Sequence, residues 1–130
     1  MGLPQRIRSL RQLASAVERG LPKSALRSSA ARIYENAAAQ SELIHRVIPE
    51  ATLKRRRDVL KADESERTER LARVIATALY VWDNEADARR FLTTAHGELD
   101  GRRPIDLALS ELGAREVEEL LWKLHYGMPV

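Results

Sequence analysis

The sequence predicts an all-α protein, and three observations support this fold class. Apolar residues recur at spacings of three and four along nearly the whole chain, as they do on one face of a helix. No segment alternates apolar and polar residues in the way a half-buried strand does. Glycines and prolines fall where helices are expected to end and begin. With 130 residues, 44% of them hydrophobic, the chain can form one compact domain or two small helical lobes with a shared core.

The first part of the chain is expected to form four helices. The first covers residues 5–19, and Gly20 ends it. The second runs over 22–35 and begins at a proline, which is favoured in the first turn of a helix. The third, over 41–47, begins at a serine that can cap its free N–H groups. The fourth covers 49–59 and also begins at a proline.

A long central helix is expected to follow and to form much of the core. Asp63 with Glu66 three residues later resembles a capping box at its start. The apolar stripe of this helix continues to Trp82. The remaining helices are expected over 85–94, 104–112 and 114–126, with Asn84 as a cap and with Gly113 and Gly127 as stops.

The composition argues against several classes of protein. There are no cysteines, which excludes disulfides and thiolate metal sites and fits a reducing cytoplasm. The most apolar stretch, 71–82, is too short to span a bilayer and contains Arg73. The basic N-terminus is not followed by the apolar region of a signal peptide. A cytoplasmic protein without membrane contact is therefore expected.

No catalytic residue, metal ligand or cofactor is expected. The three histidines, His45, His96 and His125, lie far apart, and no two have the spacing of a metal site. No glycine-rich phosphate loop follows a strand, and no serine lies in a nucleophile-elbow pattern. We therefore expect a binding protein rather than an enzyme.

The net charge of +3 conceals an uneven distribution. Residues 1–80 hold 16 Lys and Arg against 9 Asp and Glu, a net charge of +7, whereas residues 81–130 hold 6 against 10, a net charge of −4. A basic half joined to an acidic half suggests two different partners. The basic half suits the phosphate backbone of a nucleic acid, although an arginine-rich helical surface is also simply soluble.

The helices expected over 41–47 and 49–59 predict a helix-turn-helix, with its turn at Ile48. Two short helices joined by a tight turn, the second of them basic, are typical of this motif. The N-terminal and outer faces of the second helix would then contact DNA, because the first residues of a recognition helix reach the base edges. The alternative is a solvated basic helix end. The candidate DNA-binding residues are Glu50, Thr52, Lys54, Arg55, Arg56 and Arg57.

The last helix is predicted to have two different apolar faces. Val117, Leu120, Leu121 and Leu124 form one inward stripe. The side chains of Trp122 and Tyr126, four residues apart, lie on another face. Such aromatic residues often dominate the binding energy of an interface, but they can also fill the edge of the chain's own core. A protein partner for this face is one of the two interpretations.

Two regions of the chain carry a family resemblance. The first consists of FL at 91–92, GRRPIDL at 101–107, GAREVEELL at 113–121 and YGMPV at 126–130. With this spacing, residues 79–130 resemble the toxin-binding domain of the Xre/MbcA/ParS antitoxins. The second consists of IPEATLKRR at 48–56, Leu60 and DESER at 63–67. With these motifs, residues 21–78 resemble more loosely the Xre-like helix-turn-helix region of full-length members, and the DNA-binding region is expected to cover residues 1–78.

The resemblance implies a type II antitoxin without enzymatic activity. Its partner would be a RES-domain toxin that degrades NAD⁺, and it would cover the active site of the toxin with its last helix and tail. It would dimerise, assemble with toxin into a larger complex and repress its own operon by binding operator DNA. By position, the toxin-binding residues would be Trp122, Tyr126, Gly127, Met128, Pro129 and Val130.

Two other functions remain open at this point. A homodimeric helix-turn-helix repressor without a toxin would bury Trp122 and Tyr126 between its subunits. A pure interaction adaptor would leave the basic cluster at 54–57 without a ligand. Residues 1–20 could belong either to the DNA-binding region or to a dimer contact. We favour the dimer contact, because the apolar stripe there is wide and has no obvious partner nearby.

Overall fold

A computed structural model describes residues 5–127 of the chain, with side chains from residue 11 onward. The described part is helical, with isolated β-bridges but no strands, which confirms the all-α fold class. None of its helices is both long and apolar enough to cross a bilayer. In chain order the elements are α1 (Gln5–Arg19), α2 (Lys23–Ile33), α3 (Ala37–Val47), α4 (Glu50–Lys54), α5 (Ala62–Trp82), α6 (Glu85–Thr93), the 3-10 helix η1 (Gly97–Leu99), α7 (Pro104–Leu107) and α8 (Glu111–His125).

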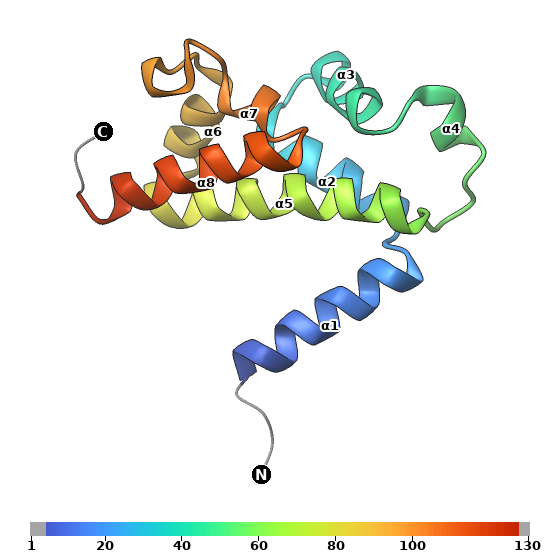
Figure 1. The fold of residues 1–130 in the computed structure, drawn as a ribbon. Helices are drawn as coiled ribbons and strands as arrows, with labels where there is room; N and C mark the ends of the chain where they lie inside the picture. The colour runs from blue at the N-terminus through green and yellow to red at the C-terminus, as the bar shows by residue number, and fades with distance from the viewer. Residues whose placement is uncertain (1–4, 128–130) are drawn as a thin grey trace.

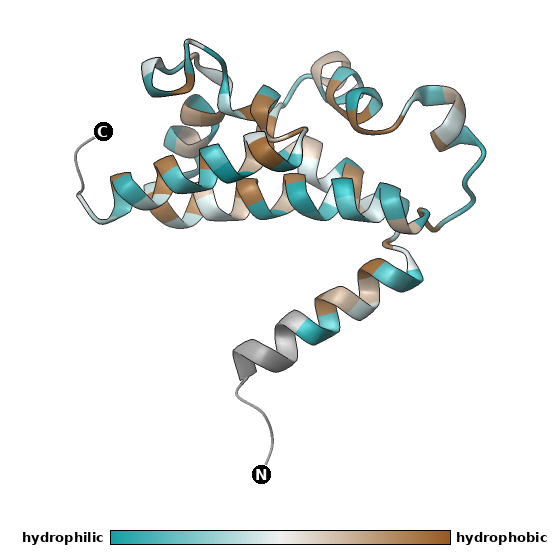
Figure 2. Ribbon diagram, in the orientation of Figure 1, coloured by the Kyte–Doolittle hydropathy of each residue, from teal (hydrophilic) through white to brown (hydrophobic). Residues whose placement is uncertain are grey.

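Helix α5 is the centre of the fold, as the sequence predicts. It runs beside α8 and also packs on α1, α2, α3 and α6 (Figure 1). Its buried residues Leu71, Val74 and Ile75 belong to one core, which also contains Val117 and Leu121 of α8. Apolar residues concentrate where these helices meet, and the segment after α4 is hydrophilic until it turns apolar just before α5 (Figure 2). The expected boundary between residues 78 and 79 falls within α5, so the two regions share this helix.

Helix α1 extends away from the body of the molecule (Figure 1). Its end at Arg19 agrees with the prediction, and Gly20 follows with φ of +98°, a conformation that favours glycine. A Cβ atom at Gly20 would lie 2.3 Å from the carbonyl oxygen of Leu60. Glycine is therefore needed twice at this turn, once for its backbone angle and once for the close approach of the chain.

The start of α3 differs from the prediction. The helix begins at Ala37 rather than Ser41, because the side chain of Asn36 accepts a hydrogen bond of 3.0 Å from the N–H of Ala39. Helix α5 likewise begins at Ala62, ahead of the predicted cap Asp63. There the Glu64 carboxylate accepts a 2.9 Å hydrogen bond from the N–H of Lys61, so the acidic half of the capping box lies two residues before the predicted Glu66.

The prediction that Gly113 separates two helices is wrong. Helix α7 ends at Leu107, and α8 begins at Glu111 with Ser110 as its cap, whose Oγ accepts a 3.0 Å hydrogen bond from the N–H of Gly113. Gly113 therefore lies in the first turn of α8. A Cβ atom there would lie 2.1 Å from the carbonyl oxygen of Leu107, so glycine is required for close packing rather than for a break. The end of α8 near Gly127, with φ of +67°, agrees with the prediction.

Candidate functional sites

Helices α3 and α4 form the predicted pair, and their connection explains why it contains no glycine. Only Ile48 and Pro49 separate the two helices. Ile48 is fully buried and extended, with φ of −135° and ψ of 119°. This is the conformation that a following proline favours. The turn therefore needs no residue with positive φ, and the buried isoleucine anchors it to the core.

Helix α4 is shorter than the predicted 49–59, because the chain after Lys54 makes backbone contacts elsewhere. The N–H of Lys23 donates to the carbonyl oxygen of Asp58 at 2.9 Å, and the N–H of Leu60 donates to that of Leu21 at 2.9 Å. Leu60 is buried in the core. These bonds hold the end of the segment 55–60, which we call the strap, against the start of α2.

The candidate residues on and after α4 are mostly exposed. Glu50 and Lys54 form an exposed ion pair of 3.2 Å along the helix. The Nη2 of Arg55 donates to Oγ1 of Thr52 at 3.4 Å. We refer to the outward-facing members of this set as the α4 surface, and they are Glu50, Thr52, Lys54, Arg55 and Arg57.

Arg56 differs from the other candidates because its guanidinium is bound to a buried carboxylate. Its Nε and Nη2 donate to the two carboxylate oxygens of Glu64 at 2.8 and 2.7 Å. Glu64 is buried, and the hydrogen bonds from Arg56 lower its pKa to about 2 despite the opposing effect of burial. The Nζ of Lys23 donates to the backbone oxygen of Arg56 at 3.1 Å. Arg56 thus fixes the strap to the start of α5, a role that its place in a basic run does not reveal.

Helix α8 has the two faces that its sequence indicates. Val117, Leu120 and Leu121 are buried. The side chains of Trp122 and Tyr126 are 38% and 71% exposed, so they do not fill the interior of this chain. Gly127 is exposed at the end of the helix, whereas Met128, Pro129 and Val130 lie outside the described residues.

Tyr80 of α5 extends the aromatic face of α8, and sequence reasoning missed it. Its side chain is 64% exposed, and its ring lies 5.9 Å from that of Trp122 and 5.3 Å from that of His125. The ring of Tyr126 lies 6.1 Å from that of Trp122. These four residues, Tyr80, Trp122, His125 and Tyr126, are the aromatic surface. The available signal was the position of Tyr80 next to, rather than on, the apolar stripe of α5.

Comparison with known families finds two matches, one in each half of the chain. Residues 77–127 match the antitoxin Xre/MbcA/ParS C-terminal toxin-binding domain. Residues 12–73 match the antitoxin Xre-like helix-turn-helix domain. The chain belongs to the Xre-type antitoxins. None of the curated proteins matches its sequence. Domains of both kinds act by binding, and the α4 surface and the aromatic surface lie in the first and second domain respectively.

A polar cluster joins the two domains of this Xre-type antitoxin. Asp106 of α7 accepts from Nη1 of Arg46 on α3 at 2.7 Å, and from Nε and Nη2 of Arg103 at 2.9 Å each. The hydrogen bonds from Arg103 are the main cause that lowers the pKa of Asp106 to about 2. Arg103 in turn lies 3.5 Å from the hydroxyl of Tyr34. Among residues 5–127, no group of three or more acidic or histidine side chains is placed to hold a metal ion.

Proposed function

We propose that this antitoxin neutralises a RES-domain toxin that degrades NAD⁺ and represses its own operon by binding operator DNA. The observation that carries the proposal is the separation of two exposed surfaces of different chemistry. The α4 surface lies at one end of the molecule, and the C-terminal end of α8 lies at the other (Figure 1). Toxin and operator could therefore be bound at the same time.

The aromatic surface and the tail after it are the proposed toxin contacts. Trp122, Tyr126 and Gly127 lie at the end of a helix that is anchored by a buried stripe, so they are held with little freedom before the toxin binds. A preorganised surface loses less entropy on binding than a loose one. Met128, Pro129 and Val130 follow directly, and we propose that they enter the active-site cleft of the toxin.

The α4 surface is the proposed DNA contact. Thr52 is the third residue of α4 and lies in its first turn, from which a recognition helix reaches base edges, and Lys54, Arg55 and Arg57 follow it. These cations suit phosphate contacts, which position a protein on the duplex. We leave Arg56 out of the contact set, because its guanidinium is already bound to Glu64.

Helix α1 is the proposed dimer contact. Its apolar residue Leu13 is exposed, and Val17 is half-buried over a hollow between α1 and α5. A second copy of the chain would cover this face, and each operator half-site would then receive one protomer. Light scattering on the intact antitoxin tests this: twice the chain mass of 14.7 kDa is expected, and a monomer at micromolar concentration would contradict the dimer.

Deletion of residues 127–130 tests the proposed division of labour. The shortened antitoxin is expected to lose neutralisation of a RES-domain toxin, measured as NAD⁺ depletion on co-expression with the toxin gene found next to its own. Operator binding in a gel shift should stay unchanged, because the α4 surface is far from the tail. Full neutralisation by the deletion variant would contradict the proposal that the tail enters the active site of the toxin. The intact chain failing to bind any adjacent toxin, while still binding operator DNA, would favour a plain homodimeric repressor.

A further inference from the structure

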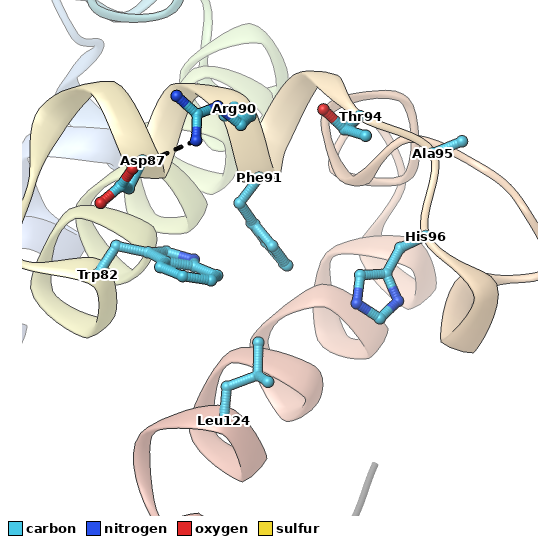
Figure 3. Close-up of a pocket in the computed structure, with 8 residues that line it drawn as sticks. All are labelled: Trp82, Asp87, Arg90, Phe91, Thr94, Ala95, His96 and Leu124. Atoms are coloured by element: carbon cyan, nitrogen blue, oxygen red, sulfur yellow. Dashed lines mark ion pairs between the residues drawn. The ribbon is translucent and has the colours of Figure 1, made fainter.

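A surface cavity lies where α5, α6, the loop before η1 and α8 meet (Figure 3). Its volume is about 270 Å³. The side chains of Trp82, Phe91, His96 and Leu124 point into the same space from four different elements (Figure 3). The other lining residues are Asp87, Arg90, Thr94 and Ala95.

The walls of this cavity are aromatic and apolar. The ring of Phe91 lies 5.8 Å from that of Trp82 and 6.1 Å, edge to face, from that of His96. Ring edges and faces arranged in this way favour a further aromatic ring. Charged groups lie on α6, where Arg90 and Asp87 form a loose ion pair of 3.7 Å and the Arg90 side chain is 76% exposed.

The size of the cavity limits what it can hold. Pockets for drug-sized ligands and cofactors usually measure about 300–1,000 Å³, so this one is small for a nucleotide but large enough for a single aromatic side chain. Its exposed lining is mainly apolar, and its charged side chains Asp87 and Arg90 are paired with each other on α6, so the lining suits an apolar group better than a small polar metabolite. A ring carried by another protein is the occupant that fits both the volume and the chemistry.

We propose that this cavity receives one aromatic side chain of the toxin and acts as an anchor separate from the tail. This inference rests on the proposed function. All eight lining residues lie within 77–127, the part of the chain that matches the toxin-binding domain. The cavity also uses the helix that carries the aromatic surface, because Leu124 of α8 is one of its lining residues. An aromatic side chain buried in an apolar pocket of a binding domain is typical of an interface hot spot.

Filling the cavity from inside tests the anchor. In Leu124→Trp, the larger ring occupies the space meant for the toxin, and binding of the intact antitoxin to the toxin should weaken at least tenfold in calorimetry. Leu112→Trp is the matched control, because residue 112 is an exposed leucine of the same helix outside the cavity. Its affinity should stay within about twofold of the wild type.

A second variant and a spectroscopic measurement distinguish a loss of toxin binding from a loss of folding. Trp82→Ala removes one wall at a half-exposed position and should weaken toxin binding similarly, while circular dichroism confirms the helical fold. The chain has two tryptophans, so 5-fluorotryptophan labelling gives one resonance each for Trp82 and Trp122. Both resonances should shift when toxin is added.

Several outcomes would overturn the anchor without affecting the proposed function. Both cavity variants binding toxin like the wild type would do so, as would a shift of the Trp122 resonance alone. A Trp82 shift that depends on the concentration of antitoxin alone would place a second copy in the cavity. A Trp82 shift on removal of residues 128–130 would place the tail there. Absence of any toxin binding by the wild type is a different result, because it contradicts the proposed function itself.

Discussion

The two ends of this antitoxin are held in place by different forces. At the α4 end, only Ile48, Leu53 and Leu60 reach the core, and the strap between the two leucines is fixed by polar bonds, above all by the pair between Arg56 and the buried Glu64. At the other end, α8 is fixed by apolar packing of Val117 and Leu121 against the core. The exposed residues differ in the same way, since cations dominate one end and aromatic rings the other.

This difference shows how one small chain can present two separate binding surfaces. A short segment fixed by charges depends on pH and on the loss of any single partner. A long helix fixed by apolar contacts has many partners, so no single polar bond decides its position. Disturbing one end should therefore leave the other largely intact, and the predictions below test that independence.

The largest effect is expected for Glu64→Gln. Glu64 is buried and Arg56 partly so, and the substitution removes the counter-charge of the guanidinium, so a loss of unfolding free energy well above that for an exposed ion pair is expected. Urea unfolding at neutral pH measures the loss. Operator binding should weaken as well, since the strap is released from α5. Glu50→Gln is the matched control: its pair with Lys54 is mostly exposed to solvent, so a change below about 0.5 kcal/mol is expected.

The pH dependence of the unfolding free energy tests whether the charge of Glu64 is what stabilises the fold. The pKa of Glu64 is lowered from 4.5 to about 2, so the carboxylate stabilises the folded state above pH 4.5. That contribution is lost as the pH falls from 4.5 towards 2. The gap in unfolding free energy between the wild type and Glu64→Gln should close over this window. If this difference in unfolding free energy stayed constant from pH 7 to pH 2, the ion pair between Glu64 and Arg56 would not be its cause.

A smaller effect is expected at the aromatic end for Trp122→Ala. Loss of a central aromatic residue from an interface costs about 2 kcal/mol, or roughly 30-fold in affinity. Calorimetric titration of the toxin measures it, and unfolding free energy should change little because Trp122 is partly exposed. Leu112→Ala, at the opposite end of α8, is the matched control and should leave toxin affinity unchanged. Equal losses for the two variants would show that the aromatic surface has no special part in the contact.

Much of the fold could be predicted because helix signals in this chain are local. The cap at Asn84 and the stop at Gly127 act on neighbouring backbone groups, and both were predicted correctly. The errors have non-local causes. Helix α4 ends early because residues 58–60 bond to residues 21–23, far back in the sequence. Gly113 was misinterpreted because its requirement comes from the carbonyl oxygen of Leu107 packing against it.

The candidate sites show the same limit. The aromatic pair on α8 follows from the spacing of Trp122 and Tyr126 within one helix. Tyr80 joins them only because α5 and α8 pack side by side, which no local pattern reveals. The sequence also gives four adjacent cations at 54–57 without distinguishing them. Only the position of Glu64 separates Arg56 from its neighbours.

The smallest effect is expected for Arg57→Ala, and it tests whether the remaining cations act as independent phosphate contacts. Loss of one exposed arginine should weaken operator binding by about 1 kcal/mol, roughly fivefold. The slope of log affinity against log salt should fall by about 0.9, because one fewer counterion is released. Gel shifts at several salt concentrations measure both. Arg90→Ala removes an equally charged, exposed side chain from α6 and should leave the slope unchanged. If both variants lower the slope alike, operator binding responds only to the overall charge of the antitoxin, and the contrast between its two ends does not extend to DNA recognition.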